Sequence, residues 1–169
     1  MKEHMKNFLC VIFILFAANP VFADETIQQE LIKQGFDYID EAHYRNAINA
    51  FKRVLEENPE NADAYYGLGI SYLGLGDTET LTIPQLVQDA IYSFKKALNF
   101  GAKHPEIYYS LGLCYLALKD KDLAIQQYDI LENLNWDLAD QLLDRIIEYE
   151  RLQEDIRPHE KVIPFEEKI

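Results

Sequence analysis

Two short stretches hold the residue types from which acyl-transfer and nucleotide-binding sites are built. Ser93 and Lys96 have the nucleophile-and-base spacing of some secreted acyl-transferring enzymes, but the other two motifs of those enzymes are absent. The Gly-Leu-Gly run at 67–69 is similar to a phosphate-binding loop, yet no predicted strand precedes it and Tyr72 replaces the third glycine. We therefore predict packing roles for these glycines and place Ser93 and Lys96 on the outer face of a helix.

The candidate metal ligands and thiols are scattered along the chain. Four histidines stand singly, and Cys114 has no Cys or His near it in sequence. Carboxylate pairs such as Asp37 with Glu41 have the spacing of a solvated helix face in an acidic protein. The sequence therefore predicts a non-enzymatic protein without a catalytic site, a metal or a cofactor.

The charge balance points away from nucleic acid as a partner. The 169 residues contain 16 Lys and Arg against 29 Asp and Glu, which gives a formal net charge of −13. Non-specific binding to DNA depends on basic side chains that displace counterions, and an acidic surface repels the phosphates. Hydrophobic residues make up 49% of the chain, enough for a packed core. These values favour a globular domain and argue against nucleic-acid binding.

The first 23 residues have the parts of a secretory signal peptide. A short basic start precedes an apolar run at 8–18, and Val21-Phe22-Ala23 follows Pro20. The run of eleven residues is too short for a membrane-spanning helix, which needs about 20. We predict cleavage after Ala23, no membrane insertion of the mature chain, and a periplasmic or extracellular location. The mature chain keeps one cysteine, so packing alone must stabilise its fold.

Three stretches of the chain share one pattern of small, aromatic and aliphatic residues. The shared positions are Leu31, Gly35, Tyr38, Ala47, Phe51 and Pro59, then Tyr65, Leu68, Gly69, Tyr72, Ala90, Phe94 and Ala97, then Tyr108, Leu111, Gly112, Tyr115, Ala124 and Tyr128. Their spacing of three, four and seven is that of one helix face. A glycine inside a helix costs about 1 kcal/mol relative to alanine, so it needs a packing reason. We predict that each repeated glycine allows close approach of the next helix, whose small alanine lies opposite.

This pattern resembles the tetratricopeptide repeat, a 34-residue helix–turn–helix unit, over about residues 27–138. The resemblance implies an all-α, right-handed α-solenoid of three helix pairs plus a C-terminal capping helix. The expected repeats are 28–61, 62–104 and 105–138, followed by a capping helix at 139–154 within a domain of residues 24–156. Residues 157–169 are expected to be a flexible tail.

The expected helices follow from caps and breakers. They span 27–42, 45–57, 62–75, 83–99, 105–118 and 121–134, with Asn61 and Asp120 as N-caps and Gly101 as a stop. Gly76 and Asp77 are expected to end the third of these helices. The second repeat is longer than the others, because 21 residues separate Gly69 from Ala90 where 12 separate the equivalent pairs. We place this nine-residue insert at 78–86, where part of it lengthens the following helix.

In the family, the first helix of each repeat lines a concave groove that binds peptides. Carried onto this sequence, the apolar groove positions are Ile32, Phe36 and Ile39, then Tyr66, Ile70 and Leu73, then Tyr109, Leu113 and Leu116. Family members that grip a C-terminal carboxylate have Lys, Arg and Asn here, so an apolar or aromatic peptide segment is the expected ligand. A helix that is apolar on two sides is either sandwiched or exposes a patch for a partner. A terminal segment of the same chain is the alternative occupant of the groove.

Three functional hypotheses remain at this point. The first is an exported adaptor that binds a protein partner in the groove. The second is a structural subunit that holds an envelope assembly together, which an obligate oligomer would favour over a monomer with an open groove. The third, which residues 2–23 argue against, resembles the acidic three-repeat chaperones of type III secretion; these are cytoplasmic and lack a cleaved signal.

Overall fold

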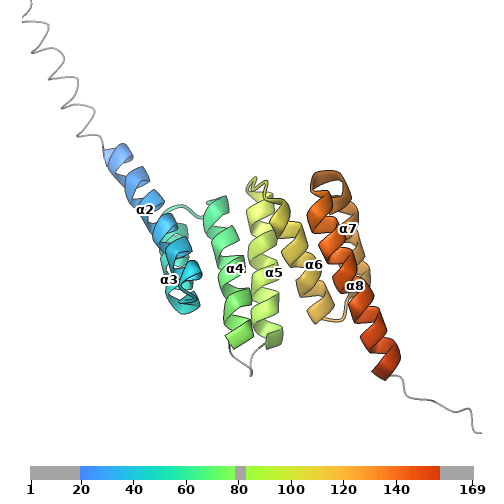
Figure 1. The fold of residues 1–169 in the computed structure, drawn as a ribbon. Coiled ribbons are helices and arrows are strands. Elements are labelled where there is room, and N and C mark those ends of the chain that lie inside the picture. The colour runs from blue at the N-terminus through green and yellow to red at the C-terminus, as the bar shows by residue number, and fades with distance from the viewer. Residues whose placement is uncertain (1–19, 79–82, 157–169) are drawn as a thin grey trace, which may run out of the picture. The chain divides into compact units, whose positions relative to one another are not determined.

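The computed structural model describes residues 20–78 and 83–156, and within these ranges it is entirely helical (Figure 1). The predicted all-α fold class is confirmed. The described helices are α2 (Pro20–Asp40), α3 (Tyr44–Glu57), α4 (Ala62–Thr78), α5 (Ile83–Asn99), α6 (Pro105–Ala117), α7 (Lys121–Leu134) and α8 (Trp136–Ile156). The first 19 residues of the predicted signal peptide and the predicted tail at 157–169 lie outside the described residues.

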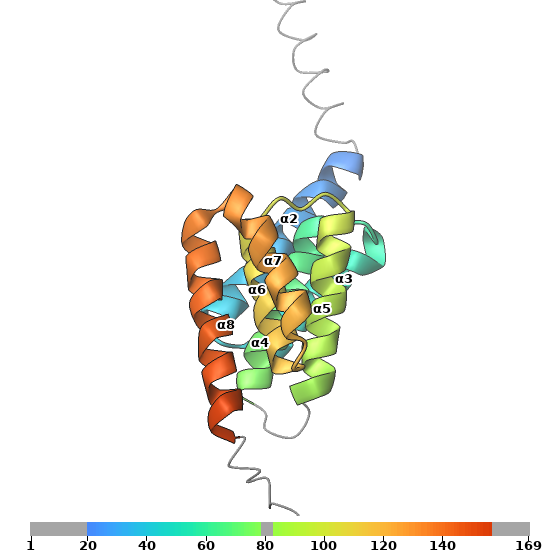
Figure 2. The same cartoon turned by 90° about the vertical axis from the view of Figure 1, so that its right-hand side faces the viewer.

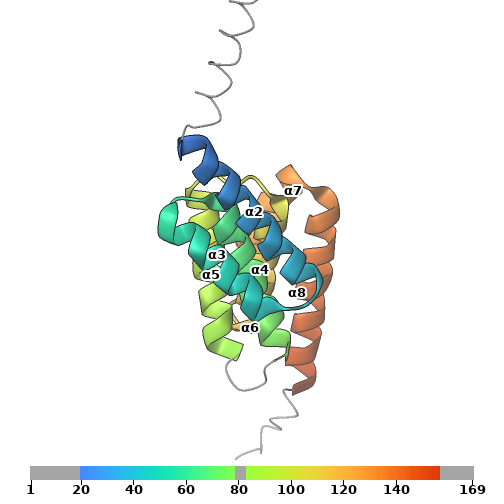
Figure 3. The same cartoon turned by 90° about the vertical axis from the view of Figure 1, so that its left-hand side faces the viewer.

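The chain divides into two compact units, which are described separately. The N-terminal unit comprises α2–α5 and extends to Ala102, and the C-terminal unit comprises α6–α8 and begins at Lys103. In the first, α4 packs against both α3 and α5, and Figure 3 shows α2 and α3 side by side. In the second, α7 and α8 lie side by side in Figure 2, and both pack on α6.

The helix boundaries follow the predicted caps and stops. The Asn61 side chain accepts the backbone N–H of Ala64 at 2.8 Å, and Asp120 accepts that of Leu123 at 3.1 Å, so both N-caps are confirmed. Gly101 ends α5 at φ +94°, and the N–H of Ala102 donates to the carbonyl of Ala97 at 2.9 Å. This six-to-one bond is the Schellman ending that a left-handed residue makes possible.

Two other helices end in the same way without a glycine. Ala42 (φ 57°) and Lys119 (φ 64°) hold the left-handed position after α2 and α6. The following N–H groups donate at 2.8 Å to the carbonyls of Tyr38 and Tyr115, which closes the same six-to-one bond. The predicted end at 42 was therefore too late, because the left-handed Ala42 cannot continue the helix, and α6 ends at Ala117, one residue before the predicted 118.

The predicted stop at Gly76 was wrong, because α4 continues to Thr78. The nine-residue insert lengthens α4 and α5, the helical hairpin of the second repeat, by about one turn each. Gly69 and Gly112 are each the eighth residue of their helix, but α4 has 17 residues and α6 has 13. Ala90 is the eighth residue of α5, whereas Ala124 is the fourth of α7. Each helix of the second hairpin has thus gained four residues, and one further residue lies between them.

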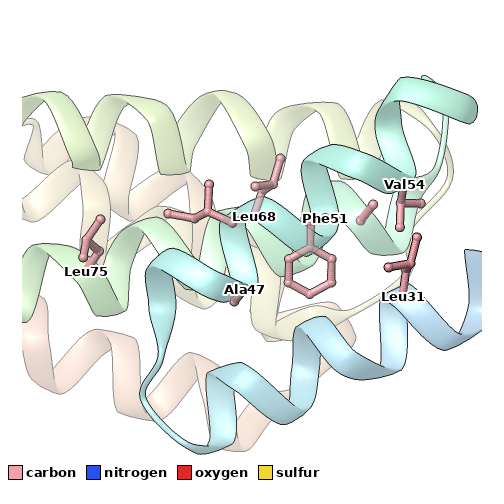
Figure 4. Close-up of a cluster of buried hydrophobic side chains, with 8 residues drawn as sticks. Leu31, Ala47, Phe51, Val54, Leu68 and Leu75 are labelled. Atoms are coloured by element: carbon pink, nitrogen blue, oxygen red, sulfur yellow. The ribbon is translucent and has the colours of Figure 1, made fainter.

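Phe51 belongs to the buried hydrophobic cluster of the N-terminal unit (Figure 4), and its ring lies between two glycines. A Cβ built on Gly35 of α2 would lie 2.6 Å from the ring, and one built on Gly67 of α4 would overlap it from the other helix. Gly69 faces the ring of Phe94 in the same way. Close approach is therefore the reason for these glycines, and the nearest atoms to Gly35 and Gly69 belong to aromatic rings and not to the expected alanines.

The third repeated glycine faces the capping helix. A Cβ on Gly112 of α6 would lie 2.5 Å from Cδ2 of Leu142 on α8, so the expected neighbour Ala124 is not its closest contact. Leu142 is fully buried, and Ala139 and Ile146 share its side of α8. The capping helix therefore begins earlier than predicted, at Trp136, where Asn135 caps it by accepting the N–H of Leu138 at 3.1 Å.

Candidate functional site

The groove positions predicted in the N-terminal unit are all half-buried. Ile32, Phe36 and Ile39 lie on α2, and all three pack against the core of the unit. Tyr66, Ile70 and Leu73 lie on α4. Spacings of four and three keep each set on one face of its helix. The structure therefore brings the aromatic members of the two sets together, as their ring contacts show.

A chain of aromatic contacts joins this face to the core. Phe36 meets Phe51 edge-on with centroids 5.1 Å apart, and its ring lies 6.2 Å from Tyr66. Tyr66 in turn lies 6.4 Å from the buried ring of Phe94. These distances are in the range of favourable aromatic pairs. Phe36 and Tyr66 are thus held by packing on one side while part of each ring stays accessible, which lowers the entropy that a ligand contact would cost.

In the C-terminal unit, some of the predicted groove positions line a pocket between two helices. Tyr109 and Leu113 of α6 are half-buried, but Leu116 is buried, so the prediction of Leu116 as an open groove residue needs correction. Leu113 and Leu116 line a pocket of about 330 Å³ between α6 and α8. The side chains of Ala117, Arg145, Glu148, Tyr149 and Leu152 complete its lining.

Sequence reasoning missed the part that α8 plays in this pocket. Arg145, Tyr149 and Leu152 lie four and three residues apart and so share a face of α8. The signal was present, because this set lies beside the core positions Leu142 and Ile146 and extends the apolar pattern by one turn. A helix that only covers the last repeat has no role for an exposed Leu152, and this residue could have pointed to the pocket.

The charges at the pocket rim are paired with one another. Arg145 donates to Glu148 at 2.8 Å, and both side chains are more than half exposed, so solvent screens the pair. Nearby, Lys121 of α7 donates to Glu150 at 2.7 Å. This hydrogen bond, with the charge of Glu150, raises the pKa of the Lys121 ammonium. The rim can therefore orient a ligand weakly, while the apolar lining supplies the contact area.

The groups with nucleophilic potential are engaged in packing. Burial raises the pKa of the Cys114 thiol to about 12, so the thiol is protonated at neutral pH. Ser93 is buried and donates to the backbone carbonyl of Asp89 at 2.8 Å, which corrects its predicted place on an outer face. The ammonium of Lys96 lies over the rings of Tyr92 and Phe100, 5.7 and 5.5 Å from their centroids. Ser93 thus makes its hydrogen bond within its own helix.

Within residues 20–78 and 83–156, no three His, Cys, Asp or Glu side chains lie close enough to hold a metal ion together. The helices of these same segments are also too short or too polar to span a bilayer.

Family models and one solved structure agree with this architecture. Models of the tetratricopeptide repeat match residues 32–80 and 105–129. The crystal structure of MamA is similar, with a TM-score of 0.53 and 23% identity over 80% of this chain and 85% of that one. A thermophilic TPR protein of Thermus thermophilus matches with a TM-score of 0.32 and 16% identity over 77% of this chain and 95% of that one. No curated protein matches the chain in sequence.

The first match spans most of the predicted first repeat and the first helix of the second, and the other match lies within the predicted third repeat. The first match covers Gly35, Phe51 and Gly67, whose packing centres on one ring, and the second covers Gly112 and Ala124. The likeness to MamA supports the all-helical fold. Two stretches of this all-α array thus match models of the tetratricopeptide repeat.

Proposed function

We propose that this chain is an exported, non-enzymatic interaction module that binds an apolar or aromatic peptide segment of an envelope or secreted partner. The observation that carries the proposal is the Phe36–Tyr66 pair on α2 and α4. Each ring is seated against a buried phenylalanine and keeps an accessible part. Preformed aromatic anchors of this kind dominate the affinity of many protein interfaces.

The chemistry of the surrounding face defines the class of ligand. The groove positions on α2 and α4 are aliphatic or aromatic, and none of the six carries a positive charge. A peptide carboxylate would lose its hydration there without gaining a charged partner. An extended or helical segment with two or three apolar side chains fits better, because it replaces water on Ile70 and Leu73 as well as on the two rings.

Binding measurements with surface variants test the proposal. Once a partner has been identified from the envelope fraction, we expect Ile70→Ser with Leu73→Ser to weaken its binding at least tenfold. Tyr66→Ala should cost about 2 kcal/mol, a loss of about thirtyfold. Tyr92→Ala is the matched control, because Tyr92 is a 59% exposed aromatic residue of α5 outside the groove set. Equal affinities for all variants would exclude α2 and α4 as the working face.

Export is tested separately by mass. The signal-like segment at residues 1–23 predicts a mature N-terminus at Asp24. The intact mass of protein recovered from outside the cytoplasm should equal that of residues 24–169. A protein that still carries Met1 would contradict export by cleavage, without bearing on the peptide-binding face.

A structural role in an assembly is the second candidate, and one patch favours it. Leu134 and Trp136 stand on either side of the turn between α7 and α8 and are 54% and 68% exposed. Large exposed apolar side chains often mark permanent contacts. Sedimentation velocity distinguishes the candidates, because an obligate oligomer that Trp136→Ser converts to a monomer would favour the structural role. A monomeric wild type favours the adaptor.

A further inference from the structure

The pocket between α6 and α8 is large and apolar enough to hold one aromatic side chain together with a second apolar side chain. Its volume is about 330 Å³. An apolar cavity of about 150 Å³ is enough to hold a benzene ring. Leu113, Leu116, Tyr149 and Leu152 provide the apolar lining, and Leu152 is 54% exposed. A chain that exposes such a side chain to water gains stability when a ligand covers it.

The chain leaves α8 beside this pocket. The helix ends at Ile156, one turn after Leu152. Thirteen residues follow in the sequence, and they contain a single apolar run, Val162-Ile163-Pro164-Phe165, between Lys161 and two glutamates. Val162 stands six positions after Ile156. This stretch can span about 20 Å when extended and about 13 Å as a flexible linker. The pocket residues from Arg145 to Leu152 cover about 10 Å of helix, so the run is within reach.

The composition of the run suits an extended segment in a pocket. Pro164 has a fixed φ and biases Ile163 toward extended backbone, so less conformational freedom is lost on docking. In an extended strand, Ile163 and Phe165 point to the same side. One segment can therefore place two apolar side chains in the same pocket while its charged flanks stay in water.

We propose that residues 162–165 dock in cis in the pocket on α6 and α8, with Ile163 and Phe165 as the anchors. Attachment through a short linker gives an effective concentration in the millimolar range, so weak intrinsic affinity is enough to keep the segment docked. Leu113 is one of the predicted groove positions and remains half-buried, so the regulatory consequence rests on the proposed function. A partner that binds at Leu113 must first displace the tail.

Methyl NMR of the full chain tests the docking without any partner. With labelled leucine methyls, we expect cross-relaxation between the Phe165 ring and Leu113, Leu116 or Leu152. Phe165→Ala with Ile163→Ser should shift these methyl resonances, whereas the control Glu167→Gln on the same tail should leave them in place. Methyls that respond to neither change would overturn the proposal. In a sample that mixes labelled and unlabelled chains, cross-relaxation between chains would show that the tail of a second copy occupies the pocket, which would also overturn docking in cis.

A competition experiment measures how much of the time the tail occupies the pocket. A synthetic peptide of residues 161–169 should bind the double tail variant more tightly than it binds the wild type, because the native tail competes in the latter. If the tail occupies the pocket nine-tenths of the time, the dissociation constant of the peptide is about tenfold higher for the wild type than for the variant. Equal affinities, or no binding to either chain, would overturn the proposal. Neither result depends on the Tyr66 experiment, so the two proposals can fail separately.

Discussion

Two glycines of α4 test whether close helix approach requires glycine, because Gly69 faces a buried ring at short distance and Gly76 has no such close neighbour. A Cβ at Gly69 would lie less than 3.0 Å from three ring atoms of Phe94, a distance that real Cβ atoms essentially never show. Phe94 is fully buried and cannot swing into solvent. At Gly76 the nearest atom is Cβ of Leu86 at 3.9 Å, an ordinary contact. Alanine should therefore destabilise the fold at Gly69 and stabilise it at Gly76.

The magnitudes follow from two opposing effects. Alanine in place of glycine gains up to about 1 kcal/mol in a helix. Overpacking a core costs about 1–3 kcal/mol, and the ring of Phe94 must move by roughly 1 Å, because its nearest atom would lie 2.4 Å from the new Cβ and ordinary contact begins at 3.4 Å. We expect Gly69→Ala to lower the free energy of unfolding by about 1–2 kcal/mol, and Gly76→Ala to raise it by about 0.5 kcal/mol near the helix end. In a chain of this length each kcal/mol shifts Tm by about 2–4 °C.

Urea and thermal unfolding, followed by circular dichroism, measure both changes on the full chain. Adding Phe94→Leu should recover part of the loss caused by Gly69→Ala, since the smaller side chain makes room for the methyl group. Neighbouring residues of this kind show coupling of about 0.5–3 kcal/mol. A Gly69→Ala chain as stable as Gly76→Ala would refute the close approach of α4 and α5 at this point.

Three further predictions concern the left-handed residues and the buried thiol. Lys119→Gly should stabilise the chain by about 0.5–1 kcal/mol in urea unfolding, because glycine relieves the strain of φ 64°. Gly101→Ala should destabilise it by about 1 kcal/mol in the same assay, since φ is +94° even though the space is open. Because the pKa of Cys114 is raised from 9.0 to about 12, its contribution to stability is complete below pH 9 and falls as pH rises toward 12. The wild type should therefore lose more unfolding free energy between pH 9 and about 11 than Cys114→Ala does, and an identical loss would count against the buried thiol.

The helices were predictable where a local signal sets their boundaries. Asn61 and Asp120 cap helices through bonds to residues three positions on, and short-range chemistry of this kind can be read from sequence. Gly76 misled the prediction, because glycine is also tolerated inside a helix when neighbouring side chains such as Leu75 are buried. The repeat pattern predicted that glycines permit close approach, but not that the partner of Gly112 is Leu142, thirty residues away.

The candidate site was predictable on α2 and α4 and less so on α6. Phe36 and Tyr66 follow the groove positions of the repeat, and the structure places their rings together. Leu116 fits the same pattern, but α8 packs on α6 and buries it. That burial depends on a helix beyond the last repeat, and a periodic pattern within α6 contains no information about its neighbour.

The extra turn on α4 and on α5 limits how this hairpin can vary in length. Four residues rotate a helix by about 400°, which is about 40° more than a full turn, so the added side chains keep nearly the same facing. Leu75 and Val87, both in or beside the added turns, are accordingly buried. Two added residues would rotate the chain beyond them by about 200° and carry an apolar stripe toward water. Viable lengths of the hairpin are thus quantised in steps of about four residues per helix. Deleting 75–78 together with 83–86 should preserve the Gly69–Phe94 contact, whereas deleting half of each segment should not.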